Sequence, residues 1–277
     1  MRKPLLYLTV LTASTCVSFS AIGFAEEVKK DAAPLDEATR KTAQESFNLP
    51  TPGEMLRAAD GKIDLKKLTA MLGEVSPVDP KASDAEQAHQ LGIRLADGFI
   101  SLYAKDAAKV KANGKVLLEI AAKLGADESI AAEGKSIGAM VDEGKWSEAS
   151  TAADTFRTRL LKSLVRDGDV EIATVASASG WLRGFGLAAD EVAQNYDGTT
   201  SRLFRQPDLA TYLAGRVGKL SAGIVEDSAT AAAALQEISK LTAVDQNADI
   251  PKESVEKIAS AAKKGLAALA GKPVTKP

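Results

Sequence analysis

Apolar residues recur at steps of three and four along most of the chain after residue 52. One such series runs through Trp146, Ala149, Ala153, Phe156, Leu160 and Leu164. These steps place one side chain per helical turn on a single stripe. No stretch keeps the period-two alternation that a half-buried strand requires. The pattern therefore predicts an all-α fold, a multi-helix bundle of antiparallel helical hairpins with roughly eight to ten helices.

Capping and turn-forming residues indicate where individual helices begin and end. Ser83 or Asp84 can cap a helix, and Asn113-Gly114 is predicted to end one. Pro207 and Pro251 are placed to begin two later helices.

Small residues are frequent on the predicted helix faces. Residues 170–196 form a long helix or two stacked helices, interrupted by Gly180, Gly184 and Gly186. Because glycine has no side chain, we expect these positions to allow neighbouring helices to approach closely.

The N-terminal 25 residues have the pattern of a secretory signal peptide. Arg2 and Lys3 precede the apolar stretch 5–19, and Gly23-Phe24-Ala25 offers small residues at the cleavage positions. We therefore predict an exported protein, periplasmic or secreted. The expected mature organisation is a flexible tether (26–52), a helical domain (53–272) with a subdivision near residue 168, and a disordered tail (273–277).

Composition excludes several classes of chemistry. The chain has 277 residues, with 35 Lys and Arg against 37 Asp and Glu, one Cys and one His. This balance provides no basic face for nucleic acid. The cysteine, Cys16, leaves with the predicted signal, so the mature protein has no disulfide and no thiol. His89 is expected to be exposed or at a boundary, which disfavours a Ser-His-Asp triad or a zinc site.

Two short motifs have weak support. The segment 184–189 matches G-x-G-x-x-A but lies in a helical rather than a strand context, so no cofactor is predicted. Ser260 and Lys263 fit the S-x-x-K pair of penicillin-recognising enzymes, which leaves an enzyme using carboxylates or Ser/Lys as an alternative.

A calcium site is a second alternative. Oxygen-bearing side chains occur at the ligand spacing of an EF-hand loop at Asp245, Asn247, Asp249, Glu253 and Glu256. The segment departs from that pattern at Ile250, where the loop requires glycine, and at Lys252. The same residue types are also common in ordinary turns and caps.

The segment 181–216 is the richest in interface-type residues. Its candidate binding residues are Trp181, Arg183, Tyr196, Arg202, Arg205 and Tyr212. Trp, Tyr and Arg combine a large contact area with a polar end, so they anchor interfaces. The segment is therefore either a recognition surface or a core layer that fixes an alanine-rich bundle.

The leading functional hypothesis is a non-catalytic binding or interaction protein of the cell envelope, with a protein or small ligand as its partner. The last helix carries lysines beside an apolar stripe, which allows peripheral contact with an anionic membrane. Because the stripe has no aromatic anchor, packing of this helix onto the bundle is favoured.

Overall fold

The computed structural model describes residues 52–59, 61–166, 169–245 and 247–270. The α-helices of these ranges, with one short 3-10 helix η1, are α2 (Pro52–Ala59), α3 (Leu65–Ala70), α4 (Asp84–Tyr103), α5 (Ala107–Lys123), α6 (Glu128–Asp142), α7 (Trp146–Arg166), α8 (Val170–Gln194), α9 (Gly198–Ser201), η1 (Arg202–Phe204), α10 (Pro207–Val217), α11 (Ser228–Thr242) and α12 (Lys252–Leu269). Apart from the four-residue α9, ten α-helices and no strand occur in the described ranges. The predicted all-α multi-helix bundle is confirmed. The predicted signal peptide, tail and nearly all of the tether lie outside the described residues.

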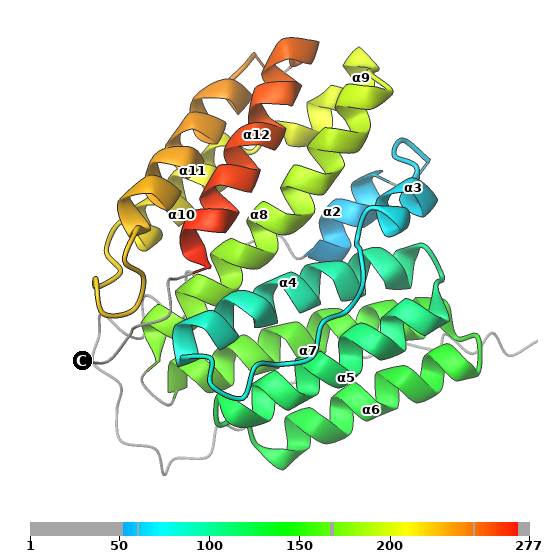
Figure 1. Ribbon diagram of the computed structural model, residues 1–277. Coiled ribbons are helices and arrows are strands. Elements are labelled where there is room, and N and C mark those ends of the chain that lie inside the picture. Colours follow the sequence, from blue (N-terminus) through cyan, green and yellow to red (C-terminus); the bar gives the residue numbers. More distant parts are fainter. Residues whose placement is uncertain (1–51, 60, 167–168, 246, 271–277) are drawn as a thin grey trace, which may run out of the picture. The chain divides into compact units, whose positions relative to one another are not determined.

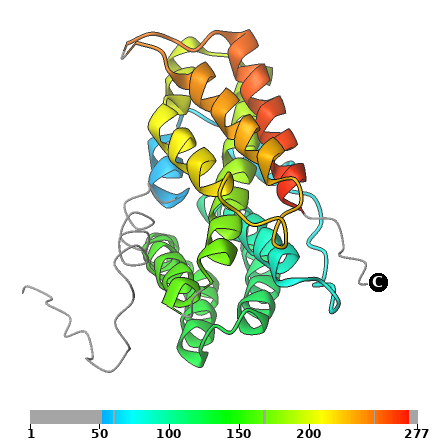
Figure 2. The ribbon, with the colours of Figure 1, turned by 90° about the vertical axis from the view of Figure 1, so that its left-hand side faces the viewer.

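By their mutual contacts the long helices form two groups of four, which can be followed in Figures 1 and 2. In the first group, α4 packs on α5, α5 on α6, α6 on α7, and α7 on α4. In the second, α8 packs on α12, α12 on α11, α11 on α10, and α10 on α8. Residue 168, where a subdivision is predicted, lies between the two groups in the sequence. One hydrophobic core nevertheless includes residues of both groups.

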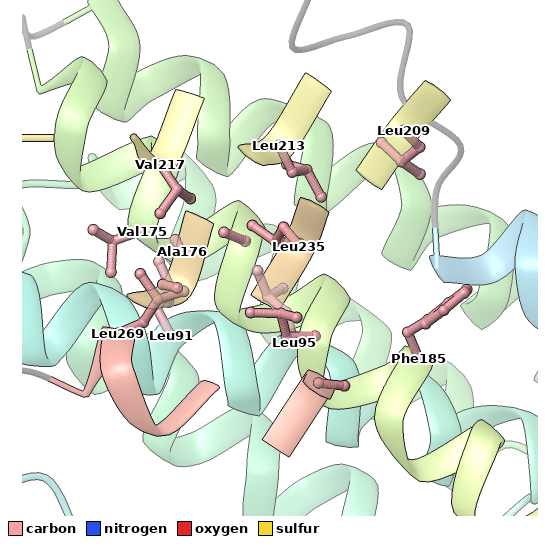
Figure 3. Close-up of a cluster of buried hydrophobic side chains, with 14 of the residues drawn as sticks. Leu91, Leu95, Val175, Ala176, Phe185, Leu209, Leu213, Val217, Leu235 and Leu269 are labelled. Carbon is pink, nitrogen blue, oxygen red and sulfur yellow. The ribbon is translucent and has the colours of Figure 1, made fainter. Parts of the chain in front are cut away.

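The contact between α4 and α8 joins the two groups. Gly92 of α4 and Gly180 of α8 let the two backbones approach closely, because a Cβ added at Gly92 would lie 2.1 Å from the carbonyl oxygen of Ala176. Leucines and valines of α4, α8, α10, α11 and α12 converge in one cluster (Figure 3). The expectation that small residues permit close helix packing is therefore confirmed for Gly180.

Most predicted helix starts are correct. Ser83 caps α4 in a capping box with Glu86, and Pro207 occupies the first turn of α10. The predicted stop at Asn113-Gly114 is wrong, since both residues lie inside α5. The Asn113 side chain donates to the carbonyl oxygen of Lys109, four residues earlier, and accepts from Arg94 of α4, so it is held within the helix instead of forming a turn.

His89 is also placed differently from the expectation. It is 5% exposed, and its Nδ1 lies 2.9 Å from the hydroxyl oxygen of Ser179 on α8. The prediction failed because α4 packs against neighbours on more than one side, so residues beside its apolar stripe are buried as well. Burial lowers the pKa of the imidazole to about 4, since the charged form loses its hydration.

Among the described residues, no helix has the length and apolar character needed to cross a membrane. The last helix, α12, buries its predicted stripe, including Val255, Ile258 and Leu269, against the bundle.

Candidate functional site

The six predicted binding residues do not line a common cavity. Arg183 of α8 binds the carboxylate of Asp97 on α4 through Nε at 2.8 Å and Nη2 at 3.3 Å. The same Nη2 donates to the carbonyl oxygen of Leu72 at 3.0 Å. This side chain therefore joins α4, α8 and the segment after α3.

Three of the six residues hold the loop before α12. The Tyr196 hydroxyl donates to the carbonyl oxygen of Ile250 at 2.9 Å, and Arg202 binds the Asp249 carboxylate at 2.6 Å. Arg205 donates to the carbonyl oxygen of Asp245 at 3.2 Å. These interactions tie the loop to η1 and to the residues just before α9 and just after η1, while Tyr196 and Arg202 remain partly exposed.

The remaining two residues lie apart from that loop. Tyr212 accepts a hydrogen bond from Arg216 at 3.1 Å, one turn later in α10. Trp181 stacks on Phe185 with ring centroids 4.3 Å apart, and Phe185 meets the edge of Phe204 at 5.2 Å. Phe185 and Phe204 are almost fully buried, so this aromatic cluster is part of the core.

Trp181 also lines a small apolar pocket of about 110 Å³ between α2, α4, α7, α8 and η1. The Trp181 Nε1 and the Gln206 Oε1 are buried without a hydrogen-bond partner, and both residues line this pocket. For comparison, an engineered protein cavity of about 150 Å³ holds one aromatic ring. The pocket is therefore of about the size that one aromatic ring fills.

The five predicted calcium ligands are not assembled into a site. Asp249 pairs with Arg202, and Glu256 lies 3.6 Å from the Lys252 ammonium within the first turns of α12. Within the described ranges, no three His, Cys, Asp or Glu side chains gather closely enough to hold a metal ion.

Ser260 and Lys263 line a polar groove between α8 and α12. The Lys263 ammonium donates to the Asp190 carboxylate at 2.8 Å. The lysine thus has a carboxylate as its partner, whereas the S-x-x-K mechanism needs it beside the serine as a base.

A larger cavity, open to solvent on one side, lies between the helices of the first group. It has a volume of about 440 Å³, and α4, α5, α6 and α7 all contribute to its wall. Most of the wall is apolar, with Leu102, Leu117 and Phe156 as examples. We refer to it below as the bundle cavity.

Glycines create much of the space in the bundle cavity. Gly98 of α4, Gly114 of α5 and Gly138 of α6 line it, and a Cβ added at any of the three would meet no atom within 4 Å. Gly134 of α6 also lines it, but an added Cβ there would meet the side chain of Leu118 at 2.6 Å. Three of the four glycines thus face open space rather than a neighbouring helix.

The ionisable residues of the cavity wall are mainly cationic. Arg94, Lys111, Lys115 and Lys135 line it, against Glu119 as the one acid. Lys111 pairs with Asp142, and the three lysines are exposed, so they mark the side where the cavity meets solvent.

Arg94 belongs to a buried charge cluster. Its Nη1 lies 3.7 Å from Asp97 Oδ2 and 3.2 Å from Asn113 Oδ1, while its Nε is buried without a hydrogen-bond partner. Burial lowers the pKa of the Arg94 guanidinium and raises the pKa of the Asp97 carboxyl, each shift disfavouring the charged form. Asp97, 1% exposed, is shared by two guanidinium groups, those of Arg94 and Arg183.

The cavity residues were not predicted from the sequence. Nothing in the sequence around Gly98 and Gly114 indicates whether these glycines lie beside a void or at a close contact between helices. Arg94 and Asp97 are three residues apart on a predicted helix, a spacing that is equally common on exposed faces.

Comparisons with protein-family models, curated protein sequences and solved structures found no match for this chain.

Proposed function

We propose that this protein is a non-catalytic binding protein that holds an apolar small molecule in the bundle cavity. The observation that carries the proposal is the cavity's apolar wall, drawn from four helices and opened by glycines that face empty space. On the basis of the predicted signal peptide, we further propose that binding takes place after export, in the cell envelope.

The size of the cavity supports this function. Protein interiors are normally packed to the density of organic crystals, with few voids larger than a water molecule. Ligand pockets have volumes of about 300–1,000 Å³, and a mostly apolar wall with a few polar groups is typical of them. The bundle cavity, with about 440 Å³, lies in that range.

The division of the hydrophobic core supports it as well. Leu102, Val110, Val141 and Ala149 form a cluster that is separate from the main core. Leu102 and Val110 line the bundle cavity, as do Leu95 and Leu117 of the main core. An apolar ligand in this position would contact both clusters and recover the dispersion contacts that the wall atoms lack.

Helix α6 is the element best suited to admit the ligand. Only Ile130 and Val141 of its residues are buried, whereas α4 buries residues along its whole length. Because α6 has so few buried contacts, its local unfolding should require less free energy than local unfolding of the rest of the bundle. We therefore expect ligand entry beside α6, next to Lys111 and Lys135.

The test is a titration with N-phenyl-1-naphthylamine, a neutral apolar dye whose fluorescence rises when it leaves water. We expect saturable binding of one dye per chain. Gly114→Leu fills the bundle cavity at a position where an added side chain has room, and we expect it to weaken dye binding at least about tenfold, a loss of about 1.4 kcal/mol.

Gly215→Leu is the matched control. Gly215 also lies within a helix and has no atom within 4 Å of an added Cβ, but it does not line the bundle cavity. Both substitutions raise helix propensity by a similar amount, so both variants should remain folded. Dye binding by Gly114→Leu at the wild-type affinity would refute the proposed function.

A further inference from the structure

We propose that the ligand of the bundle cavity is a single-chain amphiphile with a carboxylate head, of the alkyl carboxylate class, bound with its head at Arg94. This inference rests on the proposed function and adds the chemical class of the ligand.

The first step is the charge balance around Asp97. Two guanidinium groups, Arg94 and Arg183, share this one buried carboxylate. Arg183 has the better geometry, with two hydrogen bonds to Asp97 and one to Leu72, while Arg94 approaches the carboxylate only to 3.7 Å. Arg94 is therefore a buried cation whose charge is only partly compensated.

The second step is the position of Arg94. It lines the bundle cavity, is 7% exposed, and has an Nε that is buried without an acceptor. A planar guanidinium matches a carboxylate in shape and charge. An anion in the cavity beside Arg94 would supply the missing negative charge at a place where water screens it poorly.

The third step is the charge at the cavity mouth. Lys111 is paired with Asp142, and the remaining lysines of the wall, Lys115 and Lys135, outnumber its single acid Glu119. Such an excess of one sign raises the local concentration of an oppositely charged ligand and speeds its association. A cationic amphiphile would be repelled at the mouth and at Arg94 alike.

The fourth step is the length of the apolar wall. On α4 the lining residues run from Arg94 to Leu102, eight positions, or about 12 Å along the helix axis. Beyond Arg94 these α4 residues include Gly98 and Phe99 and carry no further charge. An unbranched alkyl chain of medium length suits this geometry, with its head at Arg94 and its tail toward Leu102.

The experiment compares decanoate with 1-decanol, which have the same chain length and differ in head-group charge. Each is titrated against the chain carrying N-phenyl-1-naphthylamine, and displacement gives its affinity. We expect decanoate to bind at least about tenfold more tightly than 1-decanol, the range of one hydrogen bond to a charged group.

Arg94→Met is the decisive variant. It keeps an apolar stem of similar length and leaves Asp97 paired with Arg183, so the fold should persist. We expect decanoate to lose about tenfold in affinity, while 1-decanol and the dye, which have no charged head, lose much less. Lys123→Met, which removes an exposed positive charge from α5 outside the cavity wall, should leave all three affinities unchanged.

The outcomes separate the two proposals. Equal binding of decanoate and 1-decanol, or an unchanged decanoate affinity in Arg94→Met, would overturn the carboxylate inference and leave the proposed function standing. Failure of decanoate to displace a bound dye would also overturn the inference alone. Absence of dye binding to the wild-type chain would overturn the proposed function itself.

Discussion

Glycines have opposite surroundings at the contact between α8 and α12 and in the wall of the bundle cavity. In the second group, Gly186 of α8 faces Ala262 of α12, where an added Cβ would lie 2.9 Å from the alanine methyl carbon. Gly265 of α12 similarly faces Ala234 and Leu182 at 3.1 and 3.2 Å. In the first group, Gly98, Gly114 and Gly138 face open space in the bundle cavity.

This difference shows that small residues alone do not produce tight packing. A glycine inside a helix costs about 0.5–1 kcal/mol relative to alanine. Where it brings two helices into contact, the added dispersion contacts offset that cost. Where a glycine faces a void, no contact within the chain offsets this free-energy cost. A bound ligand would supply the missing dispersion contacts.

Removing the charge of Asp97 should have the largest effect, because this carboxylate holds a guanidinium from each group of helices. Asp97→Asn leaves the buried Arg94 and the half-buried Arg183 without a counterion, so we expect the free energy of unfolding to fall by about 3–5 kcal/mol. Urea denaturation followed by circular dichroism measures this loss.

Asp249→Asn is the control for Asp97→Asn. It removes the carboxylate partner of Arg202 from an exposed pair, with 39% and 45% of the two side chains accessible, so it should cost at most about 1 kcal/mol. Equal losses in the two variants would mean that the Asp97 cluster does not differ from a surface ion pair.

Gly92→Ala tests whether close contact joins the two groups. The added Cβ would lie 2.1 Å from the Ala176 carbonyl oxygen and 2.7 Å from the Gly180 nitrogen, both backbone atoms that cannot rotate away. We expect a loss of about 3 kcal/mol from overpacking, measured by the same denaturation. Gly184→Ala, whose added Cβ meets only Ala96 at 4.0 Å, should be tolerated, and a comparable loss there would contradict the geometric argument.

The pH dependence of stability tests the same interface through His89. The folded pKa is about 4 and the ordinary value is 6.5, so between these values the unfolded chain binds a proton that the folded chain does not. The stabilisation is complete above about pH 6.5 and is lost as the pH falls toward 4, with a total of about 3 kcal/mol.

His89→Gln isolates this contribution, because the chain has no other histidine. Carboxyl groups titrate in both proteins and cancel in the comparison. Between pH 7 and pH 4.5 we expect the wild type to lose about 2 kcal/mol more than the variant. Parallel pH profiles would show that the imidazole is not desolvated in the folded protein.

The periodicity of apolar residues predicted the all-helical fold, because one stripe per helix is enough to bury these helices. It could not predict which faces beside the stripe are buried, so His89 was expected to be exposed and Asn113 to end a helix. Both errors arise from α4, which packs on α5, α7 and α8 and buries polar residues that a single stripe does not reveal. The bundle cavity escaped prediction for a related reason, since the space around Gly98 depends on how four successive helices, α4 to α7, pack together.

The smallest expected effects have opposite signs and test the comparison most directly. Gly98→Ala adds a methyl group to the wall of the bundle cavity without a clash, so we expect a gain of about 0.5–1 kcal/mol from helix propensity. Gly186→Ala adds the same group at 2.9 Å from Ala262, so crowding should exceed the propensity gain and give a net loss of about 1 kcal/mol. Both glycines lie in the interior of long helices, so both substitutions change helix propensity by the same amount. The difference between the two changes in unfolding free energy therefore measures packing. Denaturation midpoints that rise for both variants would show that the contact between α8 and α12 is no more tightly packed than the wall of the bundle cavity, and the contrast between these two regions would then not hold.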